Sequence, residues 1–69
     1  MVYIFKTSVT SSESVKDLKP LLDKIFEIHK WNFDLEDCDN ILRIDSNKNI
    51  SDKIIKILES HNFNCLELF

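Results

Sequence analysis

The order in which hydrophobic patterns follow one another is the strongest constraint on how this chain folds. Four segments have the apolar alternation or β-branched and aromatic content typical of strands, at residues 2–8, 31–36, 41–45 and 65–69. Two segments space their apolar residues like helices, from Thr10 to about Ile28 and from Ser51 to about His61. The chain therefore reads strand, helix, strand, strand, helix, strand.

The first helix has a clear start signal and one irregularity. Thr10 followed three residues later by Glu13 makes a capping box. Pro20 lacks a backbone donor, so it should kink the helix or sit in an early turn after a later start. The expected core-facing stripe consists of Val15, Leu18, Leu22 and Ile25, with His29 as a further candidate at its end.

The second helix is bounded by signals at both ends. Ser51 is the expected N-cap, and Ile50 and Ile55 have the spacing of a hydrophobic staple around it. Asn62 can adopt the left-handed conformation that glycine usually supplies at a helix C-terminus. This matters because the chain contains no glycine.

The element order predicts an α+β fold of the ferredoxin-like βαββαβ type, a single domain over residues 1–69. Four antiparallel strands should form one sheet with both helices on one face. Alternation places Tyr3 and Phe5 inward and Lys6 outward, because burying an unpaired lysine is costly. In the other strands Leu42, Ile44, Leu66 and Leu68 are expected inward, and Ile41 and Arg43 outward.

The net charge and the number of cysteines argue against several classes of function. The net charge of −3 argues against nucleic acid, because binding phosphates needs a surplus of Lys and Arg. Residues 31–45 are the most acidic, so an electrostatic partner would be a cation or a basic protein surface. Two cysteines are too few for a disulfide scaffold, and the first apolar run is too short for a signal peptide or a membrane span. We therefore expect a cytoplasmic protein with no membrane partner.

Nearly the whole chain resembles a heavy-metal-associated domain, the fold of copper chaperones, and the second half is the clearer part. The resemblance rests on Phe33-Asp-Leu-Glu, on Leu42-Arg-Ile-Asp, and on the isoleucine-rich stretch from Ile54 to the step at Asn62-Phe63. It implies the ferredoxin-like fold and a metal site in a Cys-x-x-Cys loop between the first strand and the first helix. Here the resemblance places Ser11 and Ser14 at the two cysteine positions. Hard, neutral serine hydroxyls cannot replace the thiolates that copper(I) prefers.

Other candidate ligands and catalytic groups are scattered. Cys38, His61 and Cys65 should lie at the same end of the sheet, but strand spacing keeps Cys38 too far from Cys65 for a tetrahedral site within one chain. The acidic stretch 34–40 lacks the glycine and the distant glutamate of a usual calcium loop, so a solvated hairpin is favoured. None of Ser8, Ser11, Ser12 and Ser14 has a His or Asp at a recognisable catalytic spacing. We expect no cofactor and no enzyme activity.

The leading hypothesis is a protein-interaction module that has lost thiolate metal capture, with a protein partner or a second copy on the sheet face that the helices leave open. The alternative is weak or transient metal binding through Cys65, His61 or Cys38, within one chain or between two chains. An apolar centre with a charged rim is typical of an interaction surface. The residues expected on that face are Val2, Ile4, Ile41, Cys65 and Phe69, rimmed by Asp34, Glu36, Arg43 and Glu67.

Overall fold

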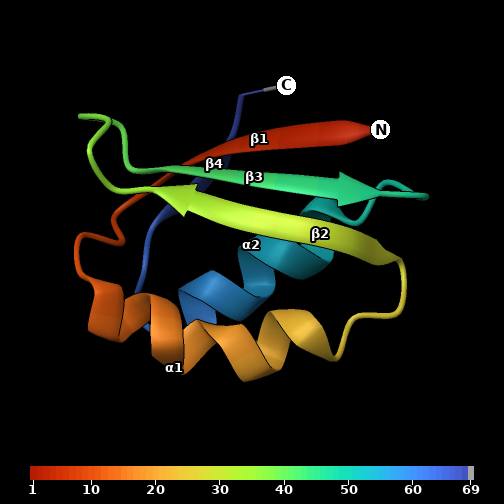
Figure 1. Cartoon of the computed structure of the whole chain (residues 1–69), viewed down its shortest axis with the longest axis horizontal. Coiled ribbons are helices and arrows are strands. Elements are labelled where there is room, and N and C mark those ends of the chain that lie inside the picture. The colour runs from red at the N-terminus through yellow and green to blue at the C-terminus, as the bar shows by residue number, and fades with distance from the viewer. Residues whose placement is uncertain (69) are drawn as a thin grey trace.

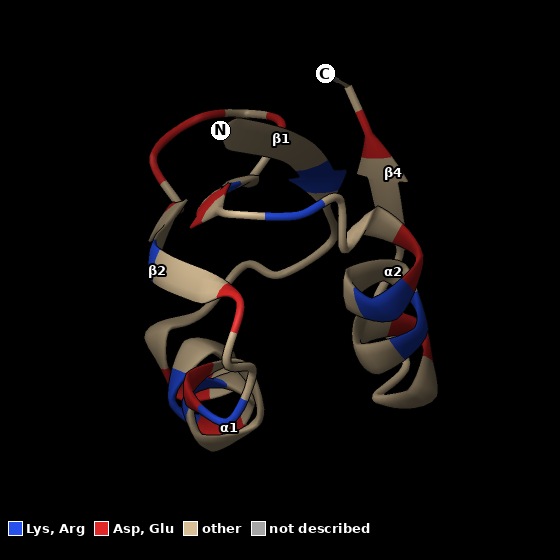
Figure 2. Cartoon of the chain, turned by 90° about the vertical axis from the view of Figure 1, so that its right-hand side faces the viewer, with Lys and Arg blue, Asp and Glu red and all other residues tan. Residues whose placement is uncertain are grey.

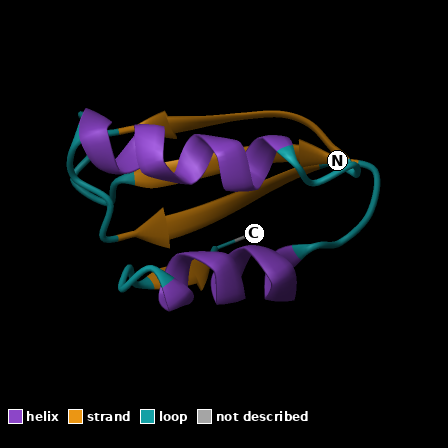
Figure 3. Cartoon of the chain, turned by 90° about the horizontal axis from the view of Figure 1, so that it is seen from below, coloured by secondary structure: helices purple, strands orange, loops and turns teal. Residues whose placement is uncertain are grey.

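The computed structural model describes residues 1–68, which form one four-stranded antiparallel sheet and two helices. The elements are β1 (Val2–Thr7), α1 (Ser12–Asp23), β2 (Ile28–Asp34), β3 (Ile41–Ser46), α2 (Ser51–Ser60) and β4 (Cys65–Glu67). The strand order is β2-β3-β1-β4, with β1 and β3 in the centre. Both helices lie side by side on one face of the sheet (Figures 1 and 3). The predicted ferredoxin-like βαββαβ fold is confirmed.

The core lies between the sheet and the two helices. Tyr3 and Phe5 are buried and Lys6 is exposed, as the alternation predicted. Leu42 and Ile44 of β3 lie opposite Phe5 and Tyr3 in the antiparallel register, and both are fully buried. The helices add further fully buried side chains to the same cluster, namely Leu18, Leu22, Ile54 and Leu58.

The first helix is shorter than predicted at both ends. Its N-cap is Ser11, whose hydroxyl accepts a hydrogen bond from the Ser14 backbone N–H, so the capping box starting at Thr10 is not formed. The helix contains Pro20 and ends at Asp23. The prediction that it continues to Ile28 with His29 on its face was wrong, because β2 begins at Ile28 and pairs with Ser46 of β3.

The second helix also starts differently from the prediction. Its N-cap is Ile50, and Ser51 is the first helical residue. The Ser51 hydroxyl donates a 2.7 Å hydrogen bond to Glu67, while the Ser51 N–H bonds to the side chain of Asn49. At the other end, Asn62 has a φ of 67°, which confirms the expected left-handed cap.

The last strand presents its leucines to the opposite face from the one predicted. Glu67 lies opposite Phe5 and Cys65 opposite Thr7, so these two residues share the helix-covered side. Leu66 therefore faces away from the helices, beside Lys6, and is 61% exposed. Leu68 is 40% exposed, and its N–H bonds to the Ile4 carbonyl. The expectation for Phe69 lies outside the described residues.

Candidate functional site: the open face of the sheet

The side of the sheet turned away from the helices, called here the open face, carries a contiguous group of exposed apolar residues. Val2 is 57% exposed and is followed two residues later on the same face by Ile4. The Ile4 carbonyl accepts a hydrogen bond from the N–H of Leu68, the residue directly after β4, and Leu66 lies two residues before Leu68. These four residues, the apolar patch, span β1 and the C-terminal edge of the sheet.

Beside the apolar patch, the connection between β2 and β3 rises over the open face. It forms an arc above the sheet in which Glu36, Asp37 and Asp39 supply the negative charge (Figures 1 and 2). We call residues 36–39 the acidic arch. Asp39 fastens it to β1, because the Lys6 ammonium lies 3.4 Å from the Asp39 carboxylate and the Thr7 N–H bonds to the Asp39 carbonyl.

The arch explains why one predicted surface residue is buried. Ile41 belongs to the open face by alternation, as predicted, yet only 6% of it is exposed. It lies two residues after the arch, between Lys6 on β1 and Asp34 on β2. The expectation that Ile41 is an exposed contact residue was therefore wrong. Arg43 is half-buried on the same face, with its guanidinium 3.8 Å from Asp34.

At the opposite end of β2 and β3 the open face is hollowed. A cavity of about 380 Å³ is lined by Val2, Lys30, Trp31, Asn32, Arg43 and Asp45. Two of the lining side chains, Lys30 and Arg43, are cationic and one, Asp45, is anionic. The Asp45 carboxylate lies 3.3 Å from the N-terminal ammonium of Met1, so the cationic groups are in excess. This basic hollow therefore carries charge of the opposite sign to the acidic arch.

Ser11 and Ser14 lie at the start of α1, and Ser11 is its N-cap. Ser11 Oγ lies 3.2 Å from the Ser14 backbone nitrogen and 3.0 Å from Ser14 Oγ. Ser11 therefore caps a backbone N–H, whereas Ser14 lies in the first turn and its hydroxyl accepts a hydrogen bond from Ser11 Oγ. The donor set of two hydroxyls that bond to one another does not suit copper(I), which requires soft thiolate ligands.

The three alternative metal ligands, Cys38, His61 and Cys65, do not lie together in one site. Cys38 is exposed in the acidic arch, and His61 caps α2 with Nδ1 2.9 Å from the Ile57 carbonyl. Cys65 begins β4 and packs against the core. Burial, followed by the charges of Glu59 and Glu67, raises the pKa of the Cys65 thiol to about 11. Cys65 is therefore a poor thiolate donor near neutral pH.

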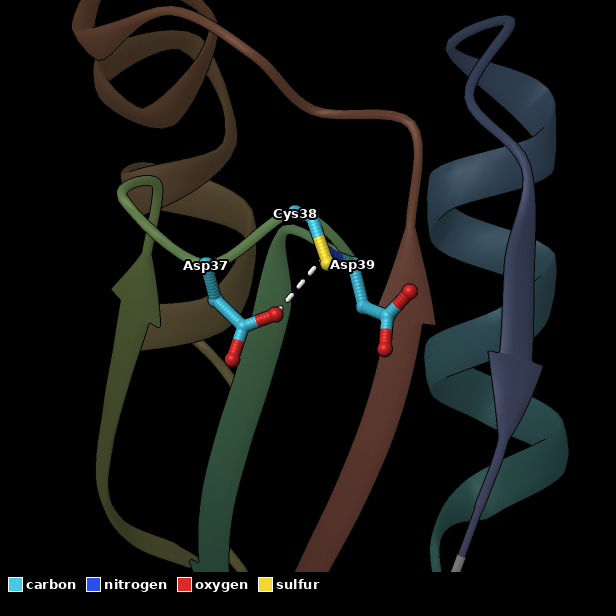
Figure 4. Close-up of side chains that lie close together, drawn as sticks. All are labelled: Asp37, Cys38 and Asp39. Carbon is cyan, nitrogen blue, oxygen red and sulfur yellow. Dashed lines mark hydrogen bonds between the residues drawn. The ribbon is translucent and has the colours of Figure 1, made fainter.

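Among the described residues, one group of three side chains has metal-ligand spacing, formed by Asp37, Cys38 and Asp39. Figure 4 shows the Asp37 carboxylate accepting a hydrogen bond from the Asp39 N–H, at 2.8 Å. The Asp39 carboxylate faces Lys6. Both carboxylates thus already have partners that shape the arch, as expected for a solvated acidic turn.

Comparison with protein-family models, with curated proteins and with solved structures found no match to this chain. Within residues 1–68, no helix has the length and apolar character needed to cross a membrane.

Sequence reasoning identified the open face and the rim residues Asp34 and Arg43 but missed two features of the site. The first is that Leu66 and Leu68 are surface residues, whereas Cys65 and Glu67 face the helices. The residue that determines which side of β4 faces the helices is Glu67, whose carboxylate accepts a hydrogen bond from Ser51 at the start of α2. The second feature is the basic hollow, which depends on Lys30 being in a strand.

Proposed function

We propose that this chain is a non-catalytic protein-interaction module that binds through its open face. The observation that carries the proposal is the apolar patch, in which Val2, Leu66 and Leu68 are exposed around Ile4 on a face that neither helix covers. Exposed apolar residues grouped on one face and bordered by charges are typical of contact surfaces. Arg43, Asp34, Lys6 and Asp39 supply that border.

The resemblance to heavy-metal-associated domains supports a related proposal, that the module descends from a metal-binding scaffold and has lost thiolate capture. Ser11 and Ser14 stand where that family has its cysteines, and the raised pKa of Cys65 weakens the best remaining ligand. A competition titration with copper(I) and with zinc tests this. We expect no tight site. One tightly bound equivalent that is lost in Cys38→Ser or Cys65→Ser would favour the metal-binding alternative instead.

The interaction role is tested by affinity capture with the open face altered. Leu66→Glu and Leu68→Glu place a charge in the apolar patch without touching the core. Phe26→Glu is the matched control, because Phe26 is 92% exposed in the connection between α1 and β2. A bound protein should be identified and its affinity remeasured with purified components. The proposal requires that the patch variants lose this partner and that the control keeps it; equal binding by all variants would refute it.

A further inference from the structure

The open face has a protrusion and a hollow of opposite charge at opposite ends of the same two strands. The acidic arch follows the last pair of the β2–β3 ladder, Asp34 with Ile41. The basic hollow surrounds the other end of that ladder, where Lys30 pairs with Asp45. The arch and the hollow are therefore separated by nearly the length of the strands, and both open on the same side of the sheet.

This arrangement is self-complementary under a two-fold rotation. Consider two copies whose open faces meet, related by a two-fold axis that lies in the interface and runs perpendicular to the strands. Each strand then lies over the same strand of the other copy but runs in the opposite direction. The arch of one copy then lies over the hollow of the other, and the reverse contact follows from the symmetry. The same operation stacks the apolar patch of β1 and β4 on its counterpart.

We propose that a second copy of this chain docks on the open face, with the acidic arch of each copy seated in the basic hollow of the other. This inference rests on the proposed function and names its partner. Glu36 and Asp37 of one copy would approach Lys30 and Arg43 of the other, so the charges match although the chain as a whole carries −3. The molecule measures 27 × 23 × 18 Å, so one face offers less than the roughly 800 Å² per partner of a standard interface. The dimer is therefore expected to be weak and reversible.

The proposal is tested by reversing single charges at the predicted contact and measuring the dimer dissociation constant. Sedimentation equilibrium of the purified chain, extended to millimolar concentration, gives this constant. Lys30→Glu and Glu36→Lys should each raise the dimer dissociation constant about tenfold, because the two-fold axis doubles every change. Lys30→Glu combined with Glu36→Lys should restore the wild-type value. Lys56→Glu is the matched control, because it changes the net charge equally on the exposed surface of α2, and it should leave the dissociation constant unchanged.

Three results would overturn the proposal: a wild-type chain that stays monomeric, a Lys30→Glu variant that behaves like Lys56→Glu, or a double variant that fails to regain affinity. Circular dichroism verifies that each variant keeps its fold. A result that excludes the dimer does not by itself exclude the proposed role in protein interaction. A monomeric chain whose patch variants lose a captured protein partner would retain the interaction role and exclude self-association.

Discussion

The indole Nε1–H of Trp31 donates a 2.9 Å hydrogen bond to the carboxylate of Asp23, which fastens the last residue of α1 to the edge strand β2. Lys19, one helical turn earlier, lies 3.0 Å from the other oxygen of the same carboxylate. The ammonium of Lys19 is also 6.0 Å from the centre of the Trp31 ring. The bond from Trp31, followed by that from Lys19, lowers the pKa of Asp23 below its ordinary value of 3.8.

This lowered pKa predicts an acid-dependent contribution to stability. Because the folded state favours the ionised carboxylate, the contribution is present above pH 3.8 and is lost as the pH falls through the lower folded-state pKa. Asp23→Asn should therefore be less stable than wild type at neutral pH, with the difference shrinking in acid. Urea unfolding followed by the fluorescence of Trp31, the only tryptophan, measures this. Asp17→Asn, on the same helix, is the control; an equal pH dependence in both variants would contradict the assignment.

The N-cap of α1 can be located by paired substitutions. Ser11→Ala removes the hydroxyl that accepts from the Ser14 N–H, so it should lower the free energy of unfolding by about 1 kcal/mol. Thr10→Ala should change it by less than about 0.5 kcal/mol, as expected for an exposed residue outside the cap. Denaturation curves of both variants decide between the two starts. A larger loss in Thr10→Ala would support the start expected from the sequence pattern.

Truncation of two apolar residues of the open face should lower the free energy of unfolding by very different amounts. Ile41→Ala removes a side chain buried under the acidic arch and should cost about 2–5 kcal/mol, enough to unfold much of a domain this small. Leu66→Ala removes an exposed side chain and should change stability by less than about 0.5 kcal/mol. Urea midpoints give both values. Equal tolerance at the two positions would show that the arch does not cover Ile41 in solution.

The two thiols should differ in reactivity. A Cys65 pKa of about 11, against an ordinary 9.0, leaves about 100-fold less thiolate in the folded protein near neutral pH. In Cys38→Ser, alkylation of the remaining Cys65 should be slow when folded and fast in urea. In Cys65→Ser, the exposed Cys38 should react at once in both states. Rapid alkylation of Cys65 in the folded protein would show that the sheet edge opens there.

The fold could be predicted because most local signals agree with the tertiary structure. The alternation in residues 2–8 placed Phe5 inward, and the absence of glycine left Asn62 to adopt the positive φ at the end of α2. The second helix ends there in a paired bond pattern, with Phe63 N–H bonded to the Leu58 carbonyl and Asn62 N–H to the Glu59 carbonyl. These are local features, and the sequence specifies them directly.

The errors arise where tertiary contacts override the local pattern. No glycine or proline marks the end of α1, and Ile28 continues its apolar spacing, but β3 extends to Ser46 and pairs with Ile28. In β4, leucine is more hydrophobic than cysteine, yet the hydrogen bond between Glu67 and Ser51 fixes Glu67 on the helix side. The burial of Ile41 depends on a turn folding over the face, which no alternation pattern encodes.

The central position of β1 also governs how quickly the sheet forms. This first strand pairs with β3 on one side and with the last strand, β4, on the other, so its hydrogen bonds close loops that span much of the chain. The entropy of closing such loops must be lost before the pairs stabilise anything. We expect this domain to fold more slowly than a helical bundle of the same size, with the three-residue β4 docking last. The strand that carries Leu66 into the apolar patch would then be the final piece of the open face to form.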